Sequence, residues 1–269
     1  LLYRSWEIMT ERSEDLAQLM TAEQGKPLRA ARAEVKYAAD FLLWFAEEAK
    51  RVTGEWLPSQ RADQRFLSVK APVGVVAAIT PWNYPFQLAM TPLVGAVAAG
   101  NTVVLKPSES SENTSLIVSE IINSVFDSSH VSVIQGDASV ASTLLKKRWD
   151  YIFYTGSTAV GKIVAKAAAE NLTPTTLELG GKSPCIIDET VPIKKTAKRI
   201  VWRKYINCGQ TCIAPDYLVV QKNIKSILVN NLINEIKSAF GKNPINSPDY
   251  GRIIHKKHFD KLKLSLKNQ

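Results

Sequence analysis

Short apolar segments alternate with helical segments along the middle of the chain, and this alternation constrains the fold more than any other feature. The apolar segments are rich in β-branched residues and end at Gly, Pro or Asn, which favours strands. Repeated strand–helix units predict a doubly wound α/β fold, with a parallel sheet covered by helices. Such sheets bind ligands at the carboxyl ends of their strands. The expected strands are 65–81, 101–107, 130–135 and 151–156, and the expected helices are 85–99, 113–126, 138–148 and 157–170.

The first fifty residues have apolar side chains at helical spacing. They predict two helices, 1–24 and 28–52, separated by the helix breakers Gly25 and Pro27.

Beyond residue 174 the sequence predicts strands and helices again, with a loop at 209–217 between a helix and a strand. No Gly/Ser-rich linker separates the two parts, so we expect a packed junction. We therefore expect a Rossmann-like dinucleotide-binding domain with N-terminal helices at 1–174. A partial α/β catalytic domain is expected at 175–269.

The positive charge of the chain lies in its last third. The formal net charge is +9, yet residues 1–190 hold 18 basic and 21 acidic side chains, whereas residues 191–269 hold 16 and 4. The lysines of this last part are scattered among apolar residues at helical spacing, without the glycine and aromatic interleaving of a nucleic-acid platform. We therefore expect a solvated basic face and no nucleic-acid partner. An acidic ligand or a nucleic-acid surface is the alternative.

The uncharged segment 71–105 invites a membrane interpretation, but four prolines and two asparagines interrupt it. No apolar run reaches the roughly 20 residues of a spanning helix, so we expect no membrane partner. Three cysteines, Cys185, Cys208 and Cys212, form no zinc-type CxxC pair, and we expect no metal site. Their odd number favours a reducing compartment, the cytoplasm.

Two of the expected strands are followed by side chains that suit a ligand site. Asn83 stands between two prolines after the first strand, where its carboxamide could stabilise an oxyanion or could simply satisfy a turn. Lys106 and Glu109 follow the next strand and could hold a ribose. A free carboxylate there disfavours a 2′-phosphate, so it favours NAD over NADP. The alternative is a loop whose acid begins a helix.

The turn after the strand 151–156 contains Gly156, Ser157 and Gly161, and it opens a helix. Small residues let backbone amides and the helix N-terminus approach a pyrophosphate. The turn has only the outer glycines of a GxGxxG motif, so tight packing alone is an equal alternative.

Glu178 and Cys212 are the remaining candidates for chemistry. Cys212 lies in a Gly-containing loop, as expected of an accessible nucleophilic thiol, and Glu178 stands before two glycines in an apolar strand, which suits a general base. The alternatives are a structural thiol and a carboxylate satisfied by Lys182 or by backbone. A regulatory disulfide between Cys208 and Cys212 is a further alternative.

Together the segments PWNYPF, KPSE, FYTGSTAVGK, LELGGKSP and NCGQTC, in this order, closely resemble the aldehyde dehydrogenase superfamily. The resemblance implies oxidation of a small aldehyde to a carboxylic acid by NAD or NADP through a thioester. It implies that Cys212 is the nucleophile, Glu178 the base, and Asn83 with the Cys212 N–H the oxyanion hole. The implied cofactor-binding residues are Trp82, Lys106, Glu109, Gly156, Ser157 and Gly180.

The resemblance is uneven along the chain. Residues up to about 80 look like succinate-semialdehyde dehydrogenases, and the sequence from Tyr84 onward looks like the class-3 or fatty aldehyde branch. We therefore expect a natural or engineered chimera, with a short semialdehyde or a medium-chain or aromatic aldehyde as substrate. The 269 residues are little more than half of a usual member, so we expect a truncated chain with exposed apolar surface and a tendency to form homo-oligomers. The alternative function is a catalytically impaired fragment that only binds nucleotide or a partner chain.

Overall fold

The computed structural model describes residues 1–267, which separate into two compact units. The first unit comprises Leu1–Ser13 and Glu34–Glu178, and the second comprises Glu14–Ala33 and the described residues from Leu179 onward. The boundary thus falls a few residues beyond 174, and a short N-terminal segment belongs with the later part of the chain. The functional division into a cofactor domain and a catalytic domain stays a prediction.

The N-terminal region forms three helices, α1 (Leu2–Glu11), α2 (Ser13–Gln24) and α3 (Leu28–Glu48). The expected helix over 1–24 is therefore wrong at Arg12, which leaves the helical conformation with φ −96° and ψ 12°. Arg12 Nη1 donates to Glu120 Oε1 at 2.7 Å, a contact distant in sequence that local propensity does not reveal. The predicted break before α3 is confirmed, since Gly25 has a φ of 65°.

The first unit contains a five-stranded sheet with the strand order β5-β4-β3-β6-β7. The pairs β3–β4, β4–β5 and β3–β6 are parallel, which confirms the predicted parallel, doubly wound sheet. The bounds of its strands are β3 Val75–Ile79, β4 Thr102–Lys106, β5 Val131–Val133, β6 Tyr151–Gly156 and β7 Thr175–Leu179.

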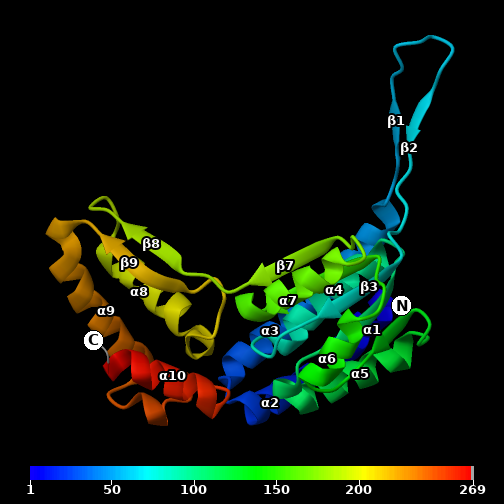
Figure 1. Cartoon of the computed structure of the whole chain (residues 1–269). Coiled ribbons are helices and arrows are strands. Elements are labelled where there is room, and N and C mark those ends of the chain that lie inside the picture. The colour runs from blue at the N-terminus through cyan, green and yellow to red at the C-terminus, as the bar shows by residue number, and fades with distance from the viewer. Residues whose placement is uncertain (268–269) are drawn as a thin grey trace. The chain divides into compact units, whose positions relative to one another are not determined.

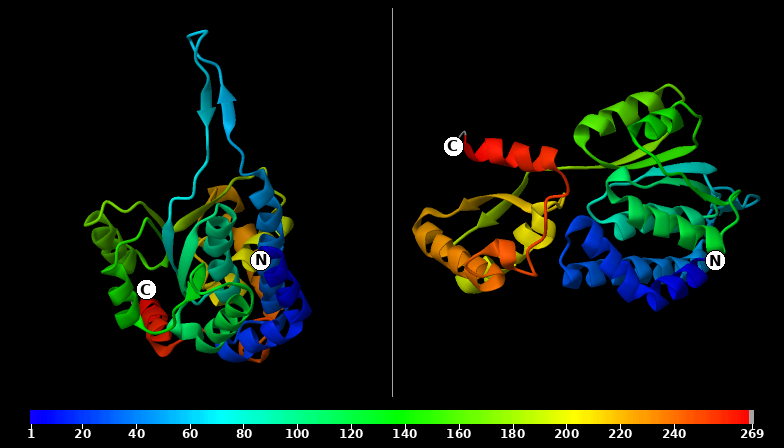
Figure 2. Two further views of the ribbon diagram at one scale, coloured as in Figure 1. Left: turned by 90° about the vertical axis from the view of Figure 1, so that its right-hand side faces the viewer. Right: turned by 90° about the horizontal axis from the view of Figure 1, so that it is seen from below.

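Helices cover both faces of this sheet. Figure 2 shows α4 and α5 on one face and α6 and α7 on the other. The chain moves from β3 to β4 and β5 in one direction and then to β6 and β7 in the other, so right-handed crossovers place these helices on opposite faces. The uncharged stretch noted in the sequence is the core of this unit, because Phe86, Met90 and Leu93 on α4 are fully buried. The helix bounds are α4 Pro85–Ala98, α5 Glu112–Val125, α6 Ala138–Leu145 and α7 Thr158–Ala169, with short 3₁₀ turns at Ala49–Arg51 and Glu109–Ser111.

The expected strand over 65–81 is in fact two separate strands. Its first part, β2 (Phe66–Ser68), pairs antiparallel with β1 (Glu55–Leu57) in a hairpin that the sequence did not reveal. Gly74, with a φ of 125°, turns the chain into β3. The hairpin extends away from the five-stranded sheet (Figure 1).

The second unit contains two parallel strands, β8 (Ser183–Ile187) and β9 (Pro215–Val220), connected by α8 (Ile193–Tyr205). α9 (Lys225–Phe240) packs on α8, and its Leu228 joins Ile187, Ala197 and Ile200 in a small buried cluster. The remaining elements are α10 Lys256–Lys267 and 3₁₀ turns at Ile206–Gly209, Lys222–Ile224 and Pro244–Asn246. Among residues 1–267, no helix is both long enough and apolar enough to span a membrane.

Leu172 gives a first test of the fold. It lies just after α7 with a φ of 55° and is 90% exposed, so its side chain gains little from packing and strains the backbone. We expect Leu172→Gly to raise the free energy of unfolding by about 0.5–1 kcal/mol, since glycine adopts this conformation without the Cβ penalty. Urea unfolding, monitored by circular dichroism, measures this change in the free energy of unfolding.

The matched control is Leu116→Gly, a half-exposed position inside α5. There the same change should lower the free energy of unfolding by about 1 kcal/mol. Destabilisation by both variants would contradict the left-handed conformation of Leu172.

Candidate active site

Three neighbouring parallel strands of the first unit end at the same level. Ile79, the last residue of β3, is in register with Lys106 on β4 and with Tyr154 on β6. Because adjacent strands lie about 4.8 Å apart, the segments that follow them emerge side by side. The crossovers from β3 and β6 also diverge here to opposite faces, which makes this edge the switch point where ligands bind. The residues that follow these strands include Trp82, Asn83, Glu109 and Ser157.

Lys106 and Glu109 form an ion pair at this edge, with Lys106 Nζ 2.9 Å from Glu109 Oε2. The lysine side chain is only 4% exposed and the glutamate side chain 49% exposed, so the ammonium is buried against a carboxylate that reaches solvent. Partial burial opposes ionisation of Glu109. The hydrogen bonds from Lys106 and from the Glu109 backbone N–H outweigh it and hold the pKa of Glu109 below its ordinary value. The pair is thus charged and partly accessible.

Gly156 and Ser157 shape the turn between β6 and α7. A Cβ at Gly156 would clash with the Tyr154 side chain, so any larger residue here would require the tyrosine to move. Tyr154 Oη donates to the Ser157 carbonyl, and Ser157 Oγ accepts from Val160 N at 3.3 Å as the N-cap of α7. Packing against Tyr154 therefore explains the glycine, which agrees with one of the two alternatives from the sequence. The turn also places the N-terminus of α7 at the carboxyl-end edge of the sheet. Nothing in the sequence indicated that Tyr154 supports this turn.

Trp82 and Asn83 lie in the short segment between β3 and α4, and both are half-buried. Thr80 N donates to the Lys106 carbonyl at 3.0 Å, so the ladder continues one residue beyond β3. α4 then begins at Pro85. The segment that carries both residues is thus short and held at its two ends.

Glu178 is exposed near the end of β7, in the first unit. One alternative from the sequence was that Lys182 neutralises the Glu178 carboxylate. Lys182 Nζ instead lies 3.2 Å from Asp216 Oδ2. Among residues 1–267 no hydrogen bond or ion pair engages the exposed Glu178 carboxylate, and its role as a base stays a prediction.

The loop before Cys212, in the second unit, has an unusual backbone. Asn207, Cys208 and Gly209 have φ values of 50°, 56° and 77°, three consecutive left-handed residues of which only the last is a glycine. Each non-glycine residue in this region costs roughly 1–2 kcal/mol, and such residues cluster at functional sites. The loop is therefore held in this conformation by its surroundings.

Gln210 supplies much of that support. Its Nε2 donates to the carbonyls of Asn207 at 3.0 Å and Arg252 at 2.8 Å, and its Oε1 accepts from Ile254 N at 3.0 Å. One side chain thus ties the cysteine loop to the segment before α10. Sequence reasoning did not single out Gln210, because two of its three partners, Arg252 and Ile254, lie more than forty residues away.

The three cysteines differ in environment, and all are free. Burial raises the pKa of Cys185 and, despite a hydrogen bond with Tyr250 and the charge of Arg252, also that of Cys208. Both thiols are thereby held protonated, whereas Cys212 is exposed. No Cys208–Cys212 disulfide is present.

Gly180 and Gly181 belong to the second unit, as Cys212 does. A Cβ at Gly181 would lie 3.9 Å from the Cys212 carbonyl oxygen, and Gly180 faces open space. Gly181 therefore lies beside the backbone of Cys212, and Gly180 leaves open space next to it.

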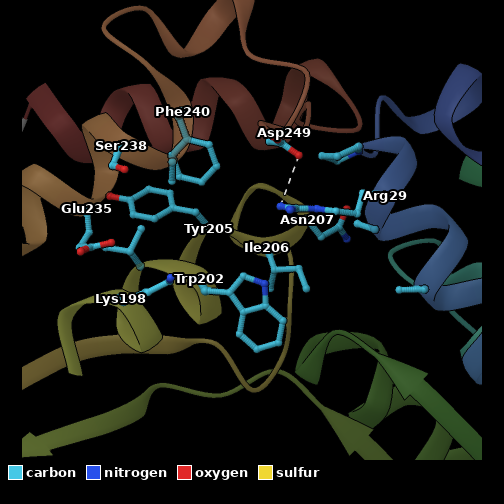
Figure 3. A pocket seen from close by; sticks show the side chains of 15 residues that line it. Arg29, Lys198, Trp202, Tyr205, Ile206, Asn207, Glu235, Ser238, Phe240 and Asp249 are labelled. Atoms are coloured by element: carbon cyan, nitrogen blue, oxygen red, sulfur yellow. Dashed lines mark ion pairs between the residues drawn. The ribbon is translucent and has the colours of Figure 1, made fainter. Parts of the chain in front are cut away.

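A cavity of about 680 Å³ lies within the second unit (Figure 3). Its apolar and aromatic walls include Trp202, Tyr205, Ile206 and Phe240, and an ion pair between Arg29 and Asp249 at 3.4 Å closes one side. Asn207, from the left-handed loop, also lines it, so the cavity adjoins the segment that carries Cys212.

The structure thus brings the predicted cofactor residues of the first unit to one edge of the sheet, and it places the backbone of Cys212 beside Gly181 in the second. The joint role of Cys212, Glu178 and Asn83 stays a prediction. No group of His, Cys, Asp and Glu suited to a metal occurs among residues 1–267.

The Lys106–Glu109 pair can be tested by pH. Glu109→Gln leaves the buried ammonium without a carboxylate, and we expect Tm at pH 7 to fall by roughly 2–4 °C, about 1 kcal/mol after solvent screening. The pKa of Glu109 is below its ordinary 4.5 in the fold. The ionised group therefore stabilises above pH 4.5, and this contribution is lost as pH falls through the folded-state pKa.

Calorimetric scans from pH 7 to pH 3 should show the two proteins converging in acid. The control Asp40→Asn breaks the exposed Lys36–Asp40 pair and should leave Tm nearly unchanged. A Glu109→Gln difference independent of pH would contradict the charged pair.

Comparison with known proteins agrees with this architecture. The model of the aldehyde dehydrogenase family matches residues 1–268. The chain is 50% identical over 198 residues to aldehyde dehydrogenase family 3 member A2 of Mus musculus, covering 74% of this chain and 41% of that one. The solved structure of the substrate-bound state of Staphylococcus aureus AldH superposes with a TM-score of 0.94 at 38% identity, covering 99% and 59%. An Escherichia coli NADP-dependent enzyme superposes with 0.90 at 34% identity, covering 97% and 56%.

The chain therefore spans about half the length of the relatives that it matches. The match to the family model extends over nearly all 269 residues and includes every segment that forms the strand-end site and the cysteine loop. The chain belongs to the aldehyde dehydrogenase family.

Proposed function

We propose that the chain oxidises an aldehyde to a carboxylic acid with NAD or NADP, by covalent catalysis at Cys212. The observation that carries the proposal is the single exposed thiol on a strained loop, in a member of this family. The thiolate adds to the aldehyde carbon and forms a thiohemiacetal. The Asn83 carboxamide and the Cys212 N–H stabilise the oxyanion.

When bound, the nicotinamide cofactor supplies the hydride acceptor that converts the adduct into a thioester. Glu178 then removes a proton from the water that attacks the thioester, which releases the acid and regenerates the thiol. The exposed carboxylate of Glu178 supports this assignment because it is open to water.

The strand-end residues fit a dinucleotide. The Glu109 carboxylate and the Lys106 ammonium can bond ribose hydroxyls, and the Gly156–Ser157 turn with the α7 N-terminus can take the pyrophosphate. Trp82 and Gly180 would complete the site. The charged Glu109 would repel a 2′-phosphate, so we favour NAD, while the NADP-dependent neighbour keeps NADP in the test.

The cavity beside the cysteine loop favours an apolar or aromatic aldehyde over a short semialdehyde. Its walls include Trp202, Ile206 and Phe240, and Arg29 is already paired with Asp249. Lys198 is the cation on its walls that could bind a carboxylate, so a semialdehyde is the alternative substrate.

A second candidate function is binding of nucleotide or of a partner chain without turnover. It is supported by the share of the relatives' length that the chain spans. Nicotinamide reduction followed at 340 nm, with octanal and succinic semialdehyde and with NAD and NADP, separates the two functions. Absence of product in all four mixtures favours the second.

We further propose a cytoplasmic location, since three free thiols suit a reducing compartment.

Homo-oligomer formation is also proposed. It is supported by exposed apolar residues on the β1–β2 hairpin. These residues are Trp56, Leu57, Phe66 and Leu67. Light scattering on the purified chain measures the oligomeric state. The chimeric origin stays a prediction.

Replacement of the nucleophile is the direct test of the mechanism. Cys212→Ala should abolish cofactor reduction, because no other thiol is exposed. Limited alkylation with iodoacetamide, read by mass spectrometry, should label Cys212 before Cys185 and Cys208. The control Cys185→Ala should keep activity, and reduction of cofactor by Cys212→Ala would refute the assignment.

The cavity predicts a dependence on chain length. Trp202→Ala removes an aromatic wall, so we expect KM for octanal to rise about tenfold, equivalent to 1.4 kcal/mol, with little change for acetaldehyde. The exposed Trp56 of the hairpin provides the matched Trp→Ala control. Equal effects of Trp202→Ala on both aldehydes would remove the cavity from the substrate site.

A further inference from the structure

A buried carboxylate holds the start of the helix that follows Asn83. Glu34 lies on α3, only 3% of its surface is exposed, and it belongs to the first unit. Its Oε1 accepts from Phe86 N at 3.1 Å and from Gln87 N at 3.4 Å. These are the second and third residues of α4.

The first turn of α4 makes this contact necessary. A helix begins with backbone N–H groups that have no partner within the helix. Pro85 has no N–H, and Leu88 N already donates to the Tyr84 carbonyl at 2.8 Å. The donors left over are those of Phe86 and Gln87, and one oxygen of Glu34 serves both. An acidic side chain in this place also suits the positive end of the helix dipole.

The contact fixes the far end of the segment that carries Asn83. The near end is held by the hydrogen bond from Thr80 N to the Lys106 carbonyl. Asn83 stands three residues before Phe86, so a shift of the first turn of α4 would be transmitted to its carboxamide.

We propose that Glu34 is a positioning residue that sets the location of the Asn83 carboxamide by anchoring the N-terminal turn of α4. The inference rests on the proposed function, in which Asn83 stabilises the oxyanion. Such donors act because they are held in place before the reaction, and a displacement of about 1 Å costs on the order of 100-fold in rate. Glu34 itself need not approach the reacting atoms.

Acylation of Cys212 by 4-nitrophenyl acetate gives a cofactor-free rate that depends on the oxyanion hole. Glu34→Ala removes the acceptor, and we expect the rate to fall roughly 10- to 100-fold. Glu34→Gln keeps a carbonyl oxygen and should restore it to within a few-fold of the unmodified chain. The matched control is Asp127→Ala, which also removes a carboxylate bound to a backbone N–H, in a turn between α5 and β5. It should leave the rate unchanged.

A double-mutant cycle separates positioning from general destabilisation. If Glu34 acts through Asn83, Glu34→Ala should change the rate less than about twofold when introduced into Asn83→Ala. An equal loss in both backgrounds overturns the proposal, as does an undiminished rate in Glu34→Ala. Should Glu34→Ala not fold, Glu34→Asp keeps the charge and draws the acceptor back by one methylene, with an expected loss of about tenfold.

A readout without activity distinguishes failure of the proposal from failure of the proposed function. In the chain labelled with ¹⁵N-asparagine, the side-chain amide signal of Asn83 is identified by its loss in Asn83→Ala. It should shift or broaden in Glu34→Ala and not in Asp127→Ala. An unshifted signal overturns the positioning role. A shifted signal with Asn83→Ala at full acylation rate supports the positioning and refutes the oxyanion function of Asn83.

Discussion

Parallel pairing of β3 with β4 on one side and β6 on the other is the constraint on which the rest of the first unit depends. The register places Ile79, Lys106 and Tyr154 at one level, so the segments that follow emerge from the same edge. Both faces of β3 are buried from Val76 to Ile79, so a shift of one residue would exchange small and large side chains between two packed faces. The apolar residues of β3 and β4 therefore determine the register, and the register assembles the site.

Much of this could be predicted from the sequence, because the relevant signals are local. The alternation of strands and helices predicted the parallel sheet. Counting along the chain placed Lys106 at the end of a strand and Asn83 and Ser157 after strands. The hairpin β1–β2 was missed because its strands have three residues each, and every one of those residues is exposed. Without a buried face there is no alternation of polar and apolar residues to read.

Residues that act through distant contacts could not be predicted. Gln210 bonds Arg252 and Ile254, and Glu34 bonds the start of α4 some fifty residues away. Nothing in their neighbourhoods in the sequence distinguishes them from exposed polar residues. Both share one physical feature: a side chain satisfies backbone groups that the local secondary structure leaves without partners. Such residues become visible only when the hydrogen bonds of the backbone are followed through the fold.

The two units support their functional loops by different means. In the first unit the Asn83 segment is short and is held by the strand ladder on one side and a buried carboxylate on the other, in ordinary backbone conformations. In the second unit the Cys212 loop contains left-handed Asn207 and Cys208, whose cost must be offset by the contacts of Gln210. The proposed oxyanion donor, Asn83, therefore depends on helix capping, and the proposed nucleophile, Cys212, depends on the side-chain contacts that hold its strained loop. Changes in one support should leave the other loop in place, so the contributions of donor and nucleophile can be separated by mutation.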